Sequence, residues 1–470
     1  MSTNTQPRTH AVVLGGGLAG MLAASVLTGH VDKVTVVERD RLPDGPEPRK
    51  GVPQARHVHM LWSGGARAIE ALVPGTIDRL TAAGARRHGV PDGLVALSPD
   101  GWWIRQRPEM QFLLAASRDL LDWVIREQVC ALPGIDLMDG TAVEGLLGDA
   151  TRVTGVEVRD QETGGSSTLE ADLVVDATGR SSRIRPWLDG LGLPPVPVET
   201  VDCGLAYATR IFRALEGVTD FPVVNVQAFP EPTRPGRGAV LVPIEKGKWI
   251  VTVAGTRGAH PTDRDDDFEA YARSTRHPVI ADLIARAEPL TSVRMTHSTV
   301  NRRLFFERLP TWPAGLLVIG DAVATYNPAY GHGMSVAAYH ATCLGDGLAK
   351  HGLAPQATRR IQRSVTRAVN DAWAMATTQD ILYPEAEGRP PNAATRMLQR
   401  YMERMSKAAT CRPTAMRAML DALSLSAPTA KLLAPRVAAI TLLGPNRPPL
   451  ADPPLTESER ALIPAADGKG

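Results

Sequence analysis

The sequence of 470 residues predicts an α/β fold in which a parallel sheet with flanking helices carries an inserted mixed β-sheet and is followed by a C-terminal helical region. Three observations lead to this prediction. An apolar run near the N-terminus ends in a glycine-rich turn at residues 15–20, and helical sequence follows it. Two later apolar runs also end in glycine turns, at Gly179 and Gly320. Strand-like sequence fills residues 201–256, and helix-like sequence fills residues 355–443.

The first turn has the spacing Gly15-x-Gly17-x-x-Gly20 and lies between a predicted strand and a predicted helix. A second predicted strand at residues 34–37 ends in Glu38, which is the order of a Rossmann-like dinucleotide-binding βαβ unit. Its glycines allow a tight turn, a close approach of the backbone to a pyrophosphate and close helix–strand packing. The helix start offers unpaired N–H groups to phosphates. The residues expected to bind here are Gly15, Gly17, Leu18, Ala19, Gly20, Glu38 and Arg39.

The middle of the chain combines one helix with several strands. Apolar residues at helical spacing predict a helix over 117–132, and short alternating runs predict strands within 137–158 and 167–175. Strand-like sequence continues over 201–256. There, two apolar runs flank residues 245–248 and predict a hairpin.

The last third of the chain is mainly helical. A helix is expected over 263–285, a buried strand at 316–319 and another helix over 334–350. Helical sequence then continues to residue 443 with a break at 384–391, and the Pro-rich tail is expected to loop over the surface. The predicted domains are a discontinuous Rossmann-like domain (8–75, 105–190 and 300–350), a substrate-binding domain (76–104 and 191–299), a C-terminal helical region (351–443) and the Pro-rich tail (444–470).

Composition excludes several classes of function. The formal net charge of +2 and the scattered Arg residues predict no nucleic-acid partner. No apolar run reaches the length of about 18 residues that a membrane span needs, and residues 1–10 lack the apolar core of a signal peptide, so we expect a cytoplasmic protein without membrane contact. The four dispersed cysteines predict neither a disulfide framework nor a metal site. His57 and His59 lack a third partner, so no metal is expected there either.

Two further motifs follow the later apolar runs. The run ending at residue 176 leads into Ala177-Thr178-Gly179, and the run at 316–319 leads into Gly320-Asp321. A carboxylate at the end of a strand can accept hydrogen bonds from ribose or ribitol hydroxyls. Pro328, Gly331 and Gly333 then leave bare backbone at the start of a helix, where N–H groups can approach a flat ring system and its phosphate.

These three motifs, in this order over residues 10–345, resemble the class A flavoprotein monooxygenases, the group that contains para-hydroxybenzoate hydroxylase and squalene epoxidase. The resemblance implies FAD as cofactor and O2 as co-substrate. The segment beginning Ser117-Arg118 resembles the family helix whose Arg lies beside the flavin. The resemblance extends the expected cofactor-binding residues to Arg56, Arg118, Gly179, Gly320, Asp321, Pro328, Gly331, Gly333 and Met334.

Residues 49–59 and 63–67 are similar to the actinobacterial polyether epoxidases of the lasalocid and monensin type. That likeness implies epoxidation of alkenes in a linear polyene polyketide, free or bound to a carrier protein, through a flavin C4a-hydroperoxide. Thr178 stands where the hydroxylases usually carry Asp, so the electron donor stays open between NAD(P)H and a separate flavin reductase. The exact substrate, the number and stereochemistry of the epoxides and the oligomeric state are open as well.

Other activities remain as alternatives. They are an aromatic-ring hydroxylase, a flavin-dependent halogenase, a prenyl-chain reductase and a flavin-binding protein without turnover. Gly101-Trp-Trp-Ile-Arg105 does not match the Trp-x-Trp-x-Ile-Pro signature of tryptophan halogenases. No catalytic side chain is predicted with certainty, because the flavin does the chemistry. His332, in the glycine-rich turn before the helix at 334–350, is the one candidate for handling a proton.

Overall fold

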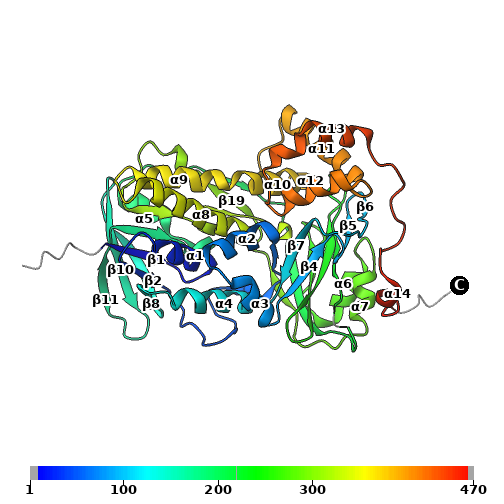
Figure 1. Cartoon of the computed structure of the whole chain (residues 1–470), viewed down its shortest axis with the longest axis horizontal. Helices are drawn as coiled ribbons and strands as arrows, with labels where there is room; N and C mark the ends of the chain where they lie inside the picture. The colour runs from blue at the N-terminus through cyan, green and yellow to red at the C-terminus, as the bar shows by residue number, and fades with distance from the viewer. Residues whose placement is uncertain (1–8, 219, 464–470) are drawn as a thin grey trace, which may run out of the picture.

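A computed structural model describes residues 9–218 and 220–463. A five-stranded parallel sheet forms one end of the molecule, with the strand order β20-β12-β1-β2-β8 (Figure 1). Its apolar strands are mostly buried, as expected for a sheet covered on both faces. The strands are β1 (His10–Leu14), β2 (Lys33–Val37), β8 (Ile135–Met138), β12 (Leu173–Asp176) and β20 (Leu316–Val318).

Three helices position the glycine turns against this sheet. α1 (Leu18–Leu27) packs against both α4 (Arg118–Cys130) and α8 (Gly333–His351). Ser117 caps α4 by accepting a hydrogen bond from Leu120 N at 3.1 Å. The helices predicted over 117–132 and 334–350 are therefore confirmed. An antiparallel sheet of β9 (Thr141–Gly148), β10 (Val153–Asp160) and β11 (Ser166–Glu170) confirms the strands predicted in this part of the chain.

A seven-stranded mixed sheet forms the other end, with the order β18-β14-β17-β16-β15-β5-β6. The predicted hairpin is present as β16 and β17, and Lys246 and Gly247 take positive φ angles in its turn. The strands are β5 (Leu94–Ser98), β6 (Gly101–Trp102), β14 (Ala206–Arg213), β15 (Val223–Val226), β16 (Arg237–Ile244), β17 (Lys248–Gly255) and β18 (Arg294–Thr296).

The prediction of a single helix over 263–285 is wrong. The structure has two short helices there, α6 (Phe268–Arg273) and α7 (Val279–Ile284). Pro278 separates them, because proline lacks the N–H that a continuous helix needs and disfavours helical geometry in the residue before it.

Two small sheets lie between the large ones. One contains β3 (Met60–Trp62), β7 (Gln111–Ala115) and β4 (Arg86–Val90), and the other contains β13 (Val198–Val201), β19 (Asn301–Leu304) and β21 (Ala324–Thr325). Helices α2 (Ser63–Leu72) and α3 (Thr76–Ala82) complete this part, whereas α5 (Ile184–Gly190) lies at the end of the molecule that holds the parallel sheet (Figure 1). The domain limits expected from the sequence stay predictions.

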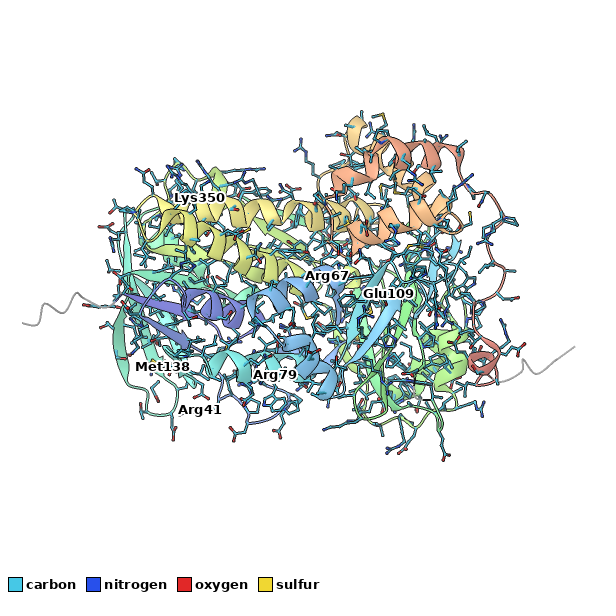
Figure 2. All side chains as sticks on the ribbon, in the orientation of Figure 1. Arg41, Arg67, Arg79, Glu109, Met138 and Lys350 are labelled. Atoms are coloured by element: carbon cyan, nitrogen blue, oxygen red, sulfur yellow. The ribbon has the colours of Figure 1, made fainter. Side chains whose placement is uncertain are left out.

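The C-terminal helices run along one side of the molecule: α9 packs on α8 at the parallel-sheet end, and α11, α12 and α13 lie above the end with the seven-stranded sheet (Figure 1). The predicted break is confirmed, because α10 ends at Asp380 and α11 begins at Ala393. Figure 2 shows Arg67 of α2 beneath these helices, where its guanidinium donates to Gln111 of β7 and to Ser426. The helices are α9 (Ala357–Ala368), α10 (Asn370–Asp380), α11 (Ala393–Ala409), α12 (Pro413–Leu423) and α13 (Pro435–Leu443).

The described part of the Pro-rich tail is fastened to the seven-stranded sheet. Leu450 forms a β-bridge with Trp102, and Arg105 pairs with Glu459 of α14 (Glu457–Arg460) at 2.5 Å. Residues 464–470 lie outside the described residues. Residues 444–463 run over the surface, as the sequence predicts, and are attached to it at these two points. Among the helices of the described ranges, none has the length and apolar character to cross a membrane.

Candidate functional site

A cavity of about 2030 Å³ runs from the glycine-rich turn after β1, past the start of α8, to the C-terminal helices. Small-molecule pockets usually measure about 300–1,000 Å³. The cavity therefore has room for a dinucleotide together with a second ligand. Its wall contains the predicted residues Gly15, Gly17, Leu18, Ala19, Glu38, Arg39, Arg56, Arg118, Gly179, Asp321, Pro328, Gly331, His332, Gly333 and Met334.

Two of the predicted cofactor-binding glycines lie outside this wall and serve packing. A Cβ on Gly20 would overlap the carbonyl oxygen of Gly15. A Cβ on Gly320, whose φ is +62°, would lie 2.8 Å from the Cβ of Ala19. Both glycines therefore let α1 approach the neighbouring turns closely.

Two helix N-termini open onto the cavity. α1 follows Gly17, and α8 follows His332, and neither of these cap residues bonds the first turn through a side chain. The first N–H groups of a helix have no partner within the helix, and the helix dipole adds a partial positive charge there. Both ends therefore suit phosphate or another electron-rich group.

Glu38, at the end of β2, is held by hydrogen bonds from backbone N–H groups and by an ion pair with Arg49. Its Oε2 accepts from Gly16 N at 2.7 Å, and its Oε1 accepts from Asp40 N at 3.0 Å. Arg49 lies 3.3 Å from Glu38 and 3.8 Å from Asp122, with only 6% of its side chain exposed. Arg49 also lines the cavity, as does Arg56, and the sequence offered either of these two arginines as a contact of the cofactor.

Asp321 lies in the cavity wall, and its carboxylate makes no hydrogen bond to any residue of the described ranges. Burial raises the pKa of Asp321, while Arg118, Arg180 and Arg302 act to lower it. His340 fixes the adjoining turn, because its Nδ1 accepts from Gly320 N at 2.8 Å. A carboxylate without internal donors, at the end of a strand, fits the hydroxyls of a nucleotide cofactor.

The middle turn depends on Asp176, which the motif analysis did not single out. Its carboxylate accepts from Thr178 N at 2.9 Å, from Thr178 Oγ1 at 2.6 Å and from Ser182 Oγ at 2.5 Å. These bonds hold Gly179, with a φ of +73°, at the cavity wall. An acid at the end of an apolar strand was the sequence signal for this role.

A family model described as an FAD binding domain matches residues 8–376. The chain belongs to this FAD-binding family. The unpartnered Asp321, the open helix starts and the glycine turns fit FAD, and the prediction of FAD as cofactor is supported. With its relatives, the family match makes the protein a flavin-dependent monooxygenase.

This monooxygenase has several relatives, and two of those described here carry different substrates in their names. It is 30% identical over 394 residues to Protein Rv3254 of Mycobacterium tuberculosis, covering 82% of each chain. It is 28% identical to kynurenine 3-monooxygenase of Salinispora arenicola, covering 73% of each chain. It is 25% identical to squalene monooxygenase of Rattus norvegicus, covering 72% of this chain and 54% of the relative.

Solved structures support the predicted α/β fold of the monooxygenase. The flavin-dependent brominase Bmp2 superposes with a TM-score of 0.65 at 16% identity, covering 93% of this chain and 98% of the brominase. PqsL of Pseudomonas aeruginosa, a probable FAD-dependent monooxygenase, gives 0.59 at 18% identity, covering 80% and 98%.

Three histidines of the monooxygenase line the cavity, and burial lowers the pKa of each to about 4. The Nδ1 of His57 lies 2.8 Å from Thr209 Oγ1, and the Nδ1 of His59 lies 2.9 Å from the carbonyl oxygen of His57. His332 Nε2 donates to Leu423 O at 3.1 Å. No group of three metal-ligating side chains is found in residues 9–218 and 220–463. Because their pKa values lie well below 7, the three imidazoles are neutral at pH 7.

The structure adds a buried polar cluster that the sequence did not indicate. Asp380 of α10 accepts hydrogen bonds from Asn301, Asn327 and Tyr330. Tyr207 of β14 joins the cluster through Asn327. All but Asn301 also line the cavity of the monooxygenase.

Proposed function

We propose that this monooxygenase epoxidises alkenes of a linear polyene polyketide, as a step in polyether antibiotic biosynthesis. The main support is the reach of the cavity beyond its glycine turns. It continues between the seven-stranded sheet and the C-terminal helices, which suits an extended substrate better than a compact one. Much of this far wall is apolar and includes Met60, Trp62, Trp103, Leu113, Leu398, Met402, Met419, Leu423 and Leu432.

The protein's part in this reaction is binding and the exclusion of water. Reduced FAD, when bound, supplies oxygen activated from O2. The two helix starts and the glycine turns would hold its phosphates, and Asp321 would accept from its hydroxyls. The apolar far wall keeps water from the reacting alkene. This chemistry requires no protein nucleophile and no metal.

His332 has a defined tautomer in this proposal. A carbonyl oxygen can only accept, so the Nε2 facing Leu423 O carries the proton. Its Nδ1 is buried without a hydrogen-bond partner among the described residues and is an acceptor. Because its pKa is lowered to about 4, His332 stays neutral at pH 7, and its Nδ1 can accept a hydrogen bond but has no proton to donate.

Oxygen transfer tests the proposed function. The holoprotein is incubated with a linear polyene and ¹⁸O2, in parallel with NADPH and with a separate flavin reductase plus NADH. Mass spectrometry should show labelled oxygen added to alkenes, and the productive arm identifies the electron donor. Reoxidation of the flavin in both arms without oxygen added to any polyene would contradict epoxidation.

An aromatic-ring hydroxylase is the second candidate. It is favoured by the likeness to kynurenine 3-monooxygenase and by the polar part of the cavity wall, where Tyr207, Asn327 and Tyr330 lie. A set of phenols and anilines in the same assay separates the two. Faster turnover of any of them than of the polyenes would favour this candidate.

A further inference from the structure

Asp380 is a buried carboxylate held by neutral donors. Only 1% of its surface is exposed, at the last position of α10. Its Oδ2 accepts from Asn301 Nδ2 at 2.6 Å and from Asn327 Nδ2 at 2.9 Å, and its Oδ1 accepts from Tyr330 OH at 2.7 Å. No ion pair to Asp380 occurs within the described part of the chain. A buried charge of this kind is stable only while its donors stay in place.

The backbone determines how both asparagine amides are oriented. Asn327 N donates to Asn301 Oδ1 at 2.8 Å, and Ala329 N donates to Asn327 Oδ1 at 3.0 Å. A backbone N–H can only donate, so each of these side-chain atoms is the amide oxygen. Both NH2 groups therefore face Asp380. Asn301 Nδ2 also donates to Val201 O at 3.2 Å, and Asn327 Nδ2 has a second, weak acceptor in Cys203 Sγ at 3.8 Å.

Two of the donors to Asp380 come from the turn that leads into α8 at the cavity wall. Asn327 and Tyr330 belong to the turn at residues 327–331, which directly precedes the open start of α8. Pro328 and Gly331 of this turn line the cavity. Tyr207 of β14 donates to Asn327 Oδ1 at 3.0 Å, so the turn is also bonded to the seven-stranded sheet.

We propose that Asp380 is a positioning residue for FAD. Its carboxyl group anchors the 327–331 turn through Asn327 and Tyr330, and the anchored turn places the N-terminus of α8 at the cofactor. Removing the carboxyl group takes the acceptor of the Tyr330 phenol and the charged acceptor of both amides, and leaves the Asn327 amide only the weak acceptor Cys203 Sγ. The turn must then shift to satisfy them. The proposal depends on FAD binding and not on the identity of the substrate.

Two substitutions at Asp380 test this anchor. Asp380→Ala should weaken FAD binding by about ten-fold or more, because the buried donors of the turn lose their charged acceptor. Asp380→Asn should stay within about three-fold of the parent, because its amide oxygen can still accept from both asparagines. Dilution of the holoprotein, followed by flavin fluorescence in the absence of substrate, gives the dissociation constants. Parent affinity in Asp380→Ala would overturn the proposal.

Asp371→Ala is the matched control, because it alters the same helix elsewhere. Asp371 lies in the first turn of α10 and accepts from Thr429 Oγ1 at 2.6 Å. Its loss should change FAD affinity by less than about two-fold, since it makes no bond to the turn. An equal loss of affinity in this control would assign the effect to the packing of α10 and overturn the proposal.

Asn327→Ala tests the same anchor if Asp380→Ala is insoluble. It removes the amide that joins Asp380 to the turn and should weaken FAD binding by a similar factor. Parent affinity in this variant would equally overturn the proposal. Because these measurements use no substrate, failure to epoxidise a polyene would refute the proposed function and leave the anchor standing.

Discussion

At the scale of single residues, Asp321 is the side chain whose surroundings most clearly suit cofactor binding. It lies in the cavity wall after β20, and its carboxylate has no hydrogen-bond donor in residues 9–218 and 220–463. Burial raises its pKa, and Arg118, Arg180 and Arg302 counteract this by favouring the charged form. The carboxylate is thus kept available for donors that come with the cofactor.

Asp321→Ala should lower the affinity for FAD by about ten-fold or more, because hydrogen bonds to charged groups contribute about 1.5–3 kcal/mol each. Flavin occupancy after gel filtration and fluorescence titration measure the loss. Asp172→Ala is the control, since Asp172 precedes β12 at the amino ends of the strands, outside the cavity wall, and accepts from His10 N. Full flavin retention in Asp321→Ala would remove Asp321 from the cofactor site.

At the scale of elements, the start of α8 depends on how closely α2 packs against it. A Cβ on Gly65 of α2 would lie 2.7 Å from Ser335 Cα and would also overlap its hydroxyl. A backbone atom cannot move aside as a flexible side chain can. The short distance between α2 and α8 therefore requires glycine at position 65.

Gly65→Ala should reduce the free energy of unfolding by about 1–3 kcal/mol, the usual cost of overpacking. Urea denaturation of the holoprotein measures it. Gly190→Ala in α5 is the matched control, because no heavy atom lies within 4 Å of its added Cβ. Equal stability of the two variants would show that α2 and α8 can separate at no cost.

At the scale of the whole molecule, burial of histidines makes stability depend on pH. Burial lowers the pKa values of six histidines from 6.5, that of His277 among them. Five are lowered strongly, four to about 4 and that of His340 to about 3. As the pH falls below 6.5 the unfolded chain binds protons that the folded chain does not, so the folded state loses stability. This loss ends once the pH is below the folded pKa values. The five are His57, His59, His88, His332 and His340.

The substitution His88→Phe removes one of these titrating histidines at a position away from the cavity. His88 lies in β4, and its buried Nε2 has no partner among the described residues. Between pH 6.5 and about 4 the variant should lose stability less steeply than the parent, by up to about 1.4 kcal/mol per pH unit. Urea titrations of both proteins across this range give the two slopes. Identical slopes would show that His88 titrates normally in the folded state.

Much of the fold could be predicted from local patterns in the sequence. Gly15, Gly17 and Gly20 indicate a tight turn, because only residues without a side chain allow the backbone to approach so closely there. The hairpin of β16 and β17 follows from the apolar runs on both sides of a polar turn. The prediction of one helix over 263–285 failed because the apolar periodicity continues across Pro278. Anchoring of the tail was also unpredictable, since the Arg105–Glu459 pair joins residues 354 positions apart.

The sequence by itself determined the α/β fold and the glycine turns of a dinucleotide-binding unit, because glycine spacing and strand ends act within a few residues of one another. Only the tertiary structure decided which polar groups meet around the cavity. Asp380 lies 53 residues from Asn327 and 79 from Asn301, and neither spacing has a periodic signature. Their contact exists because α10 packs across β19 and the turn before α8, where a buried carboxylate requires every donor within reach.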